Sequence, residues 1–327
     1  DLAIDHDTGW VYVSAFDRRP YMAGDRSVRG MIGVFSLTGG DNAVIDLSDP
    51  ARSGAPTKFA PHGLSLYVGA DGKKALGVVN HADGEAVEIF DIVEQVSNTA
   101  LSGAPNIVHR RTVRSPLFHS MNDLVMVSPN AFYVTNDHRF PAGVTKTGAY
   151  SAGLLRTLED YLMLPLTDIV YFDGKEASVA AKSLVYANGI AVSADGRFLH
   201  VAETTRNSIR SYARDAGNGA LTPVMDRWGI VDLKFGVDNI DVAADGTLYV
   251  GGHPKLFALA KNFKDASALS PSQVTRLRLD AGAWDVKTVY LNDGSQISGV
   301  SVGARHQDML VIGSIFGKDI LVCPAAD

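Results

Sequence analysis

The 327-residue sequence lacks several features that would place it in a specialised class. Its one cysteine, Cys323, excludes a disulfide within the chain. No run of 18 or more apolar residues occurs, so we expect no transmembrane segment. There is no basic stripe, and the net charge is −6, which argues against nucleic acid as a partner. The sequence begins at Asp1 rather than at a methionine, and we expect a processed chain.

What the sequence does contain is a short pattern that occurs six times. One or two polar residues lead a brief alternating strand, which is followed by a turn and a second strand. The pattern occurs at residues 1–4, 62–66, 122–126, 188–192, 238–242 and 298–302. Three of the following turns contain Asp-Gly, which suits tight hairpins. The repeats start roughly 50 to 65 residues apart, the spacing of propeller blades.

We therefore predict an all-β fold, a six-bladed β-propeller with a central channel, formed by a single domain over residues 1–327. Composition does not shift anywhere along the chain, and no linker divides it. Each blade has a predicted second strand, and the six are Gly9–Ala15, Ala75–His81, Ala131–Asp137, Phe198–Thr204, Thr247–His253 and Met309–Ile315. Outer strands are predicted over Val87–Ile92, Ser208–Arg214 and Phe257–Leu259.

One insertion, Arg139–Leu166, does not fit the blade pattern. Within it apolar residues recur at helical spacing, and these are Tyr150, Leu154, Leu155, Leu158, Tyr161 and Leu162. They predict a helix over about 148–163 near one mouth of the channel. Two interpretations stay open: a surface helix packed on a blade, or a lid over the mouth, where substrate-facing loops tend to lie. The leucines favour an apolar acyl or aryl substrate.

The hairpin turns predict which residues face each other across the first two strands of a blade. With two-residue turns, opposed positions in an antiparallel pair sum to a constant. The facing pairs predicted in this way are His62–His81, Asp238–His253, Asn188–Glu203 and Asn122–Asp137. Opposed side chains approach closely enough to hydrogen-bond, although a slip of one residue would turn the partners to the other face.

Six equivalent strand starts would meet at the propeller axis, and four of them carry Asp or Asn. Their donors are carboxylate and amide oxygens, from Asn122, Asp123, Asn188, Asp238 and Asn239. Hard oxygen ligands without nitrogen or sulfur favour Ca²⁺ over Zn²⁺, and flexible, numerous ligands favour it over Mg²⁺. The competing interpretation is a polar, water-filled channel that holds no ion.

His62 and His81 are the candidate catalytic residues. Two imidazoles that face each other at a channel mouth can fix each other's tautomer and raise the basicity of the outer ring. Such a pair can act as a general base on water near neutral pH. The alternative is two polar residues that satisfy each other's hydrogen bonds without a chemical role.

Several motifs in the same order resemble the paraoxonase (serum arylesterase/lactonase) family along nearly the whole chain. They are Phe59-Ala60-Pro61-His62-Gly63, Val79-Asn80-His81, Asn122-Asp123-Leu124, Thr135-Asn136-Asp137-His138, Ala187-Asn188-Gly189-Ile190, Val237-Asp238-Asn239-Ile240 and Gly252-His253-Pro254. The resemblance implies a six-bladed propeller with two calcium ions in its channel.

The resemblance also implies a role for each matching residue. The catalytic calcium would be bound by Asn122, Asn188, Asp238 and Asn239, together with a glutamate that in the family directly precedes the position of Asp1. The structural calcium would be bound by Asp1, Asp123 and the backbone carbonyl of Leu64. His62 and His81 match the family's histidine pair, His253 matches a pocket histidine, and Cys323 matches a cysteine that pairs near the N-terminus.

The function implied is calcium-dependent hydrolysis of lactones and aryl esters, with possible promiscuous organophosphate hydrolysis. Calcium would polarise the carbonyl, and the histidine pair would activate water. One alternative is a sugar-lactone hydrolase of the gluconolactonase type. Another is a non-catalytic, calcium-bound propeller that binds a protein partner. Because calcium is scarce in the cytosol, we expect a secreted or periplasmic location, and a small-molecule lactone or ester as the ligand.

Overall fold

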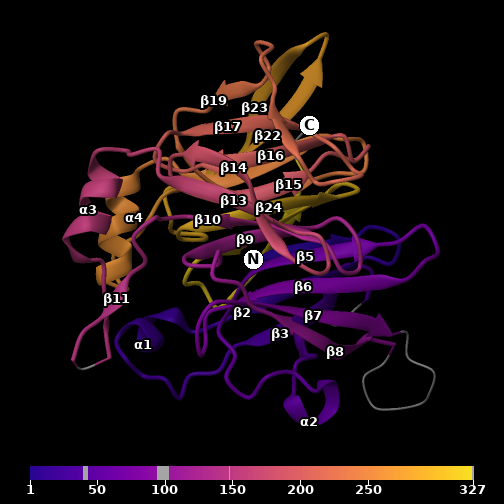
Figure 1. Cartoon of the computed structure of the whole chain (residues 1–327), viewed down its shortest axis with the longest axis vertical. Helices are drawn as coiled ribbons and strands as arrows, with labels where there is room; N and C mark the ends of the chain where they lie inside the picture. Colours follow the sequence, from indigo (N-terminus) through magenta and orange to yellow (C-terminus); the bar gives the residue numbers. More distant parts are fainter. Residues whose placement is uncertain (40–42, 94–102, 147, 326–327) are drawn as a thin grey trace.

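The computed structural model describes residues 1–39, 43–93, 103–146 and 148–325, which form six antiparallel sheets arranged as the blades of a β-propeller (Figure 1). The chain enters each sheet at the propeller axis and works outward. The innermost strands are β1 (Leu2–Asp5), β5 (Pro61–Val68), β9 (Met121–Met126), β15 (Ala187–Val192), β20 (Gly236–Val242) and β24 (Val300–His306).

The second strands lie close to their predicted positions. They are β2 (Trp10–Ala15), β6 (Lys74–Asn80), β10 (Phe132–Asn136), β16 (Phe198–Glu203), β21 (Leu248–His253) and β25 (Met309–Ser314). The third are β3 (Met31–Ser36), β7 (Ala86–Val93), β13 (Thr167–Phe172), β17 (Ser208–Arg214), β22 (Ser272–Asp280) and β26 (Leu321–Pro324). Outside them lie β4 (Ile45–Asp46), β8 (Asn106–Val113), β14 (Ala177–Leu184), β18 (Leu221–Pro223), β19 (Ile230–Asp232) and β23 (Ala283–Asn292).

The innermost strands contact each other in chain order, and β24 contacts β1, so the ring is closed. Apolar side chains fill the space between successive blades. At the closure Leu2 and Phe35 of the first blade pack against Val302 and Val311 of the last. Full burial of such a side chain contributes about 1.5–3 kcal/mol. The predicted six-bladed propeller is confirmed.

The predicted hairpin registers are wrong by one residue in three of the four hairpins. In the β5–β6 hairpin Val68 pairs with Lys74, and the Gly69 N–H donates to the Lys73 carbonyl. The connection is therefore a three-residue loop rather than a two-residue turn, which shifts every opposed pair. The Asp-Gly signal itself was sound, since Gly72 adopts a φ of 78°, the left-handed region that favours glycine.

Four helices occur in the described part of the chain: α1 (Arg18–Met22), α2 (Pro50–Ser53), α3 (Gly153–Tyr161) and α4 (Leu256–Lys264). The outer strand predicted at Phe257–Leu259 is wrong, because these residues lie within α4. A short apolar run fits either element, and here it extends over nine residues with a 3.6-residue period. None of the described helices has the length and hydropathy of a membrane span.

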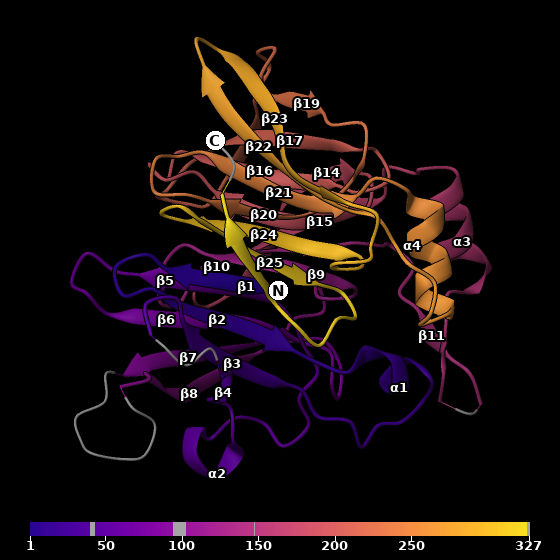
Figure 2. The ribbon, with the colours of Figure 1, turned by 180° about the vertical axis from the view of Figure 1, so that it is seen from behind.

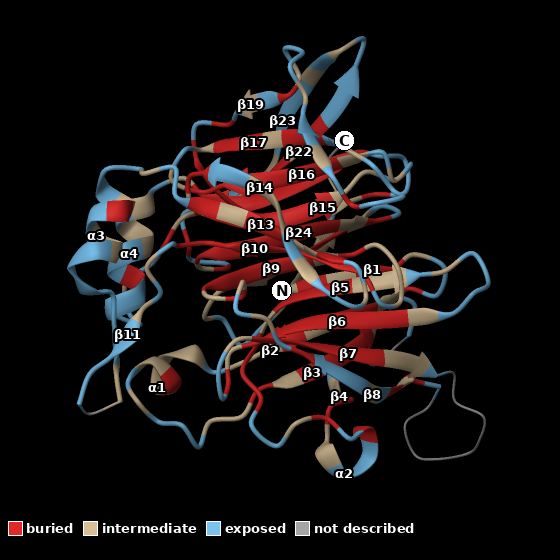
Figure 3. Cartoon of the chain, in the orientation of Figure 1, coloured by how far each residue is buried: buried red, intermediate tan, exposed pale blue. Residues whose placement is uncertain are grey.

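The predicted helical insertion is present but begins later than expected. A small ribbon, β11 (Gly143–Val144) with β12 (Tyr150–Ser151), precedes α3. Helices α3 and α4 lie side by side at one edge of the propeller in both views (Figures 1 and 2). The innermost strands are buried, whereas most of α3 is exposed (Figure 3).

Candidate active site and metal centre

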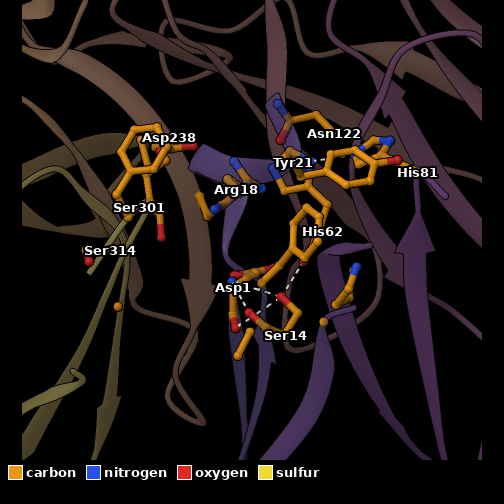
Figure 4. A pocket seen from close by; sticks show the side chains of 18 of the residues that line it. Asp1, Ser14, Arg18, Tyr21, His62, His81, Asn122, Asp238, Ser301 and Ser314 are labelled. Atoms are coloured by element: carbon orange, nitrogen blue, oxygen red, sulfur yellow. Dashed lines mark hydrogen bonds between the residues drawn. The ribbon is translucent and has the colours of Figure 1, made fainter. Parts of the chain in front are cut away.

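A cavity of about 1090 Å³ opens where the innermost strands begin (Figure 4). Five of these strands contribute a polar side chain at or next to their first residues: Asp1, His62, Asn122, Asn188 and Asp238. His81, Asn239 and His253 line the same cavity. The structure therefore brings eight of the ten predicted site residues together. Asp123 and Leu64 are buried and do not line the cavity, although Leu64 donates its N–H to Asp1, which does.

A β-bulge sits at the start of four innermost strands, and each bulge holds predicted site residues. Two residues oppose one at each place: His62-Gly63 opposite Val79, Asn122-Asp123 opposite Thr135, Asn188-Gly189 opposite Ala202, and Asp238-Asn239 opposite Gly251. A bulge breaks the strict alternation of side chains and re-aims them. Neighbouring residues such as Asp238 and Asn239 can therefore both face the channel axis.

Glycines in two of these bulges let the blades approach closely. A Cβ on Gly189 would lie 2.4 Å from the Asp238 carbonyl oxygen and 2.5 Å from the Asn239 Cα. A Cβ on Gly63 would lie 2.5 Å from the Asp123 Cα. Since real Cβ atoms do not approach this closely, only glycine permits the observed spacing of the ligand-bearing strands.

The amide side chains present unpaired oxygens to the axis. Asn188 donates its Nδ2 to Thr204 Oγ1 at 2.9 Å, which leaves its Oδ1 buried without a hydrogen-bond partner. Asn239 Oδ1 is also buried and unpartnered. Asn122 donates its Nδ2 to Asp137 Oδ2 at 3.2 Å, which likewise turns its oxygen away from that carboxylate. Buried acceptors without donors are costly, and a hard cation satisfies them. These residues fit Ca²⁺.

A second set of oxygens lies beside the first. Asp123 accepts the N–H groups of Leu124 and Ile190, and Asp1 accepts those of Leu2 and Leu64. Burial raises the pKa of Asp123 to about 7, against the lowering effect of its two backbone hydrogen bonds. A buried carboxylate that makes no ion pair with a side chain fits a nearby cation. The donors are oxygens only, and no cluster of three or more His, Cys, Asp or Glu suited to a metal occurs among the described residues.

His62 and His81 are in contact, as predicted. Their Nδ1 and Nε2 atoms, respectively, lie 2.9 Å apart, and His81 Nδ1 lies 3.0 Å from Glu85 Oε1. The Glu85 carboxylate can only accept, so His81 donates from Nδ1 and accepts at Nε2 from His62. This chain of hydrogen bonds leaves the lone pair of His62 on Nε2. Glu85 was not predicted, because it lies in the loop between β6 and β7, where no periodicity indicates the direction of a side chain.

The charge state of His62 is biased toward the neutral ring. Burial, the nearby Arg18 guanidinium and His81 together hold its pKa well below the usual 6.5. A neutral imidazole is the form that can accept a proton. The position of His62 in the cavity and its tautomer therefore agree with a general base.

His253 contacts a predicted calcium ligand. Its Nε2 lies 3.1 Å from Asp238 Oδ2, and both side chains are buried. The predicted ladder pair is absent, because Gly236 stands opposite His253 and the bulge intervenes. The contact is made anyway by the re-aimed Asp238 side chain. The predicted Asn188–Glu203 contact is wrong, since Glu203 pairs with Arg210 at 2.9 Å.

The predicted Asn122–Asp137 contact is present, and it continues in a buried hydrogen-bonded chain through His138 that the sequence did not predict. His138 lies between two carboxylates, with Nδ1 2.7 Å from Asp137 Oδ1 and Nε2 2.8 Å from Asp160 Oδ1. Burial alone would lower the pKa of His138, but Asp137 and Asp160 raise it to about 9. The charged His138 thus holds Asp137 in place, and Asp137 in turn orients the Asn122 amide.

Helix α3 borders the cavity through polar and small residues. Arg156 of α3 and Ala152, the residue before the helix, line it, and Arg156 lies 3.8 Å from the Asp137 carboxylate. Leu154 and Leu162, by contrast, are 73% and 61% exposed and do not line the cavity. These leucines therefore give no support to an apolar substrate, and the apolar part of the cavity wall comes from other residues, such as Phe16, Met121 and Phe316.

Comparisons with known proteins agree on one family. A family profile described as Arylesterase matches residues 41–324. Serum paraoxonase/arylesterase 1 of Homo sapiens is 32% identical over 88% of this chain and 75% of its own length. Its Mus musculus counterpart is 31% identical over 90% of this chain and 77% of its own length. Serum paraoxonase/lactonase 3 of Oryctolagus cuniculus is 32% identical over 80% of this chain and 68% of its own length.

Solved structures share the fold at much lower identity. A gluconolactonase from Xanthomonas campestris superposes with a TM-score of 0.51 at 16% identity, covering 98% of this chain and 86% of that one. A protein from Lactobacillus plantarum superposes with a TM-score of 0.53 at 13% identity, covering 96% of this chain and 91% of that one. These likenesses concern the propeller alone.

Proposed function

The chain belongs to the arylesterase (paraoxonase) family, and from this premise we propose that its cavity hydrolyses lactones and aryl esters. Membership makes the chain an ester hydrolase, and it removes the support for a non-catalytic propeller. The observation that carries the proposal is that His62 lines the same cavity as Asn188 and Asn239, whose amide oxygens are unpaired. The cavity thus contains both a base that can activate water, His62, and oxygen ligands that can bind a Lewis-acidic metal ion.

The proposed metal ligands divide into two sets. Asn122, Asn188, Asp238 and Asn239 would hold a catalytic calcium, whose bound form supplies Lewis-acid polarisation of a carbonyl oxygen. Asp1, Asp123 and the Leu64 carbonyl would hold a structural calcium. The second set draws on three different blades, so we expect it to stabilise the closed ring.

The protein's own part in the chemistry is to move one proton and to hold the base. His62 Nε2 accepts a proton from an attacking water, and His62 then carries the positive charge. His81 accepts the hydrogen bond from His62 Nδ1, and Glu85 fixes His81 in the matching tautomer. His253, beside Asp238, lines the substrate pocket.

The test is hydrolysis of a γ- or δ-lactone and of phenyl acetate by the purified chain with calcium, followed by pH-stat titration. The matched control is Asn188→Ala, which removes a proposed ligand oxygen and leaves the histidine pair in place. Glucono-δ-lactone is run in parallel, because the gluconolactonase type is the alternative. The proposal is supported if the wild type, but not Asn188→Ala, hydrolyses the lactone and phenyl acetate. If glucono-δ-lactone is the only substrate hydrolysed, the gluconolactonase type is favoured.

We also propose a secreted or periplasmic location. The relatives are named as serum proteins, and the two proposed sites would fill readily where calcium is abundant. Fractionation of the native cells tests this location.

A further inference from the structure

One guanidinium in the cavity has no protein partner. Arg18, the first residue of α1, projects toward the space between Asp238 and His62 (Figure 4). Its side chain makes no hydrogen bond or ion pair with any residue that the structure describes. None of its nitrogens is among the buried unpaired atoms, so the guanidinium faces the cavity itself.

The other two arginines of the cavity are occupied. Arg29 donates to the carbonyl oxygens of Gly30 and Ser48, at 3.0 and 2.6 Å. Arg156 lies 3.8 Å from Asp137. Both therefore act in the architecture of the cavity wall, and only Arg18 of the three stays available to a ligand.

Burial and nearby acidic groups act on the charge of Arg18 in opposite directions. Burial lowers the pKa of Arg18, against the charge of Asp238 and the phenol groups of Tyr186 and Tyr150. Asp238 does not serve as its ion-pair partner, because Asp238 Oδ2 accepts from His253 and the carboxylate belongs to the proposed calcium site. The guanidinium is half-buried and has no ion-pair partner among the described residues, so an anion that enters the cavity would stabilise it.

The chemistry of the guanidinium indicates which anion. Its planar fork of donors matches a carboxylate, with two parallel hydrogen bonds, better than it matches a neutral carbonyl. The cavity wall also contains apolar side chains, among them Phe16, Met121 and Phe316, so it suits a ligand that has both a carbon skeleton and an anionic group.

We propose that Arg18 binds a carboxylate on the substrate, so that the preferred substrates are lactones or esters that carry a carboxylate beside the scissile group. This inference rests on the proposed hydrolase function of the same cavity. The carboxylate lies on Arg18, and the ester carbonyl is directed at the calcium site that Asn188 and Asn239 are proposed to form. Arg18 is thus a specificity-determining residue and takes no part in proton transfer.

The test compares two substrates that differ only in charge, γ-carboxy-γ-butyrolactone and its uncharged carboxamide. Charge-assisted hydrogen bonds are strong enough to give the wild type a kcat/KM ratio of about 10 to 100 in favour of the carboxylate. Arg18→Gln should bring that ratio near unity, and Arg18→Lys should keep part of it. The ratio is the readout because a change in the pKa of His62, which Arg18 lowers, affects the rates on both substrates alike. Arg139→Gln, which removes an exposed arginine, is the matched control and should keep the full ratio.

A binding measurement separates this inference from the proposed function. Glutarate has two carboxylates, whereas glutaramate has one carboxylate and one uncharged carboxamide. Calorimetry of the calcium-loaded wild type with each ligand measures how much affinity the second carboxylate adds, and the same titrations of Arg18→Gln show whether this gain in affinity is abolished. If no lactone or ester is hydrolysed but the gain is seen and depends on Arg18, the hydrolase proposal fails and the carboxylate site stands. Equal binding of the two ligands, or a substrate ratio near unity in the wild type, overturns the role of Arg18.

Discussion

His62 Nδ1 lies 2.9 Å from His81 Nε2, although the two residues do not stand opposite each other in the β5–β6 ladder. The bulge at His62-Gly63 turns the first ring toward the cavity, and His81 follows the end of β6. Glu85 then holds His81 through a hydrogen bond of 3.0 Å to Nδ1. The proposed base His62 is therefore held by His81, and His81 is held in turn by Glu85.

The first prediction concerns this chain of three residues. His62→Gln removes the proposed base, and we expect kcat/KM for a lactone to fall by about 10²- to 10⁴-fold. Glu85→Gln removes the charge that fixes the tautomer, so we expect a smaller loss together with a changed pH profile of kcat/KM. His109→Gln, whose ring contacts Glu88 outside the cavity, is the control. Equal activity of His62→Gln and the wild type would exclude His62 as the base.

The second prediction concerns the proposed structural calcium. Asp123→Asn keeps the size of the side chain and removes its charge, so the calcium-induced rise in Tm should shrink. Saturation of a site at a hundred times its Kd stabilises the native state by about 2.7 kcal/mol, which thermal melts resolve readily. The exposed Asp226→Asn should keep the full shift. An unchanged calcium response in Asp123→Asn would remove Asp123 from the ligand set.

The third prediction concerns the glycine between blades four and five. A methyl group on Gly189 would collide with the Asp238 carbonyl oxygen and the Asn239 Cα. Gly189→Ala should therefore cost about 1–3 kcal/mol of unfolding free energy and weaken calcium binding, because Asp238 and Asn239 must move. Gly143→Ala, where the nearest atom lies 3.9 Å away, is the control. Denaturant titration and calcium calorimetry measure the two effects, and wild-type values for both would contradict the close approach.

The fourth prediction concerns the pH dependence of the unfolding free energy, to which the buried His200, outside the cavity, should contribute. Burial lowers the pKa of His200 to about 4, and its Nδ1 lies 2.9 Å from Ser211 Oγ. Between pH 4 and the ordinary value of 6.5, the unfolded chain binds the proton and the native chain does not. The free energy of unfolding should thus fall as the pH drops through this window, by about 3 kcal/mol in total.

His200→Gln should remove that part of the pH dependence, because glutamine does not titrate and still offers a hydrogen bond to Ser211. Urea titrations of both proteins at several pH values measure it. Parallel curves of unfolding free energy against pH for the two proteins would contradict the assignment.

The sequence predicted the blades well and the details of their inner ends less well. The hydrophobic alternation and the Asp-Gly turns located the second strands within one or two residues, since both signals are local. The register was wrong in three of four hairpins, because loop length and bulges depend on packing between blades rather than on the turn residues.

The sequence predicted the residue types of the candidate site and three of its contacts, His62–His81, Asn122–Asp137 and Asp238–His253, but not the residues behind them. His62 and His81 meet because the bulge compensates for the register error in that hairpin. Arg18 and His138 carry no periodic signal, so their positions in the cavity and behind Asn122 appear only in three dimensions. The outward leucines of α3 show that helical spacing locates a helix without saying what its apolar face covers.

The most direct test of the central claim is the rate of γ-lactone hydrolysis before and after calcium is removed with EGTA. The account predicts that the activity is lost on chelation, returns when calcium is restored, and does not return with magnesium at the same concentration. Equal activity in the presence of EGTA, or full rescue by magnesium, would contradict a calcium site built from the amide oxygens of Asn122, Asn188 and Asn239.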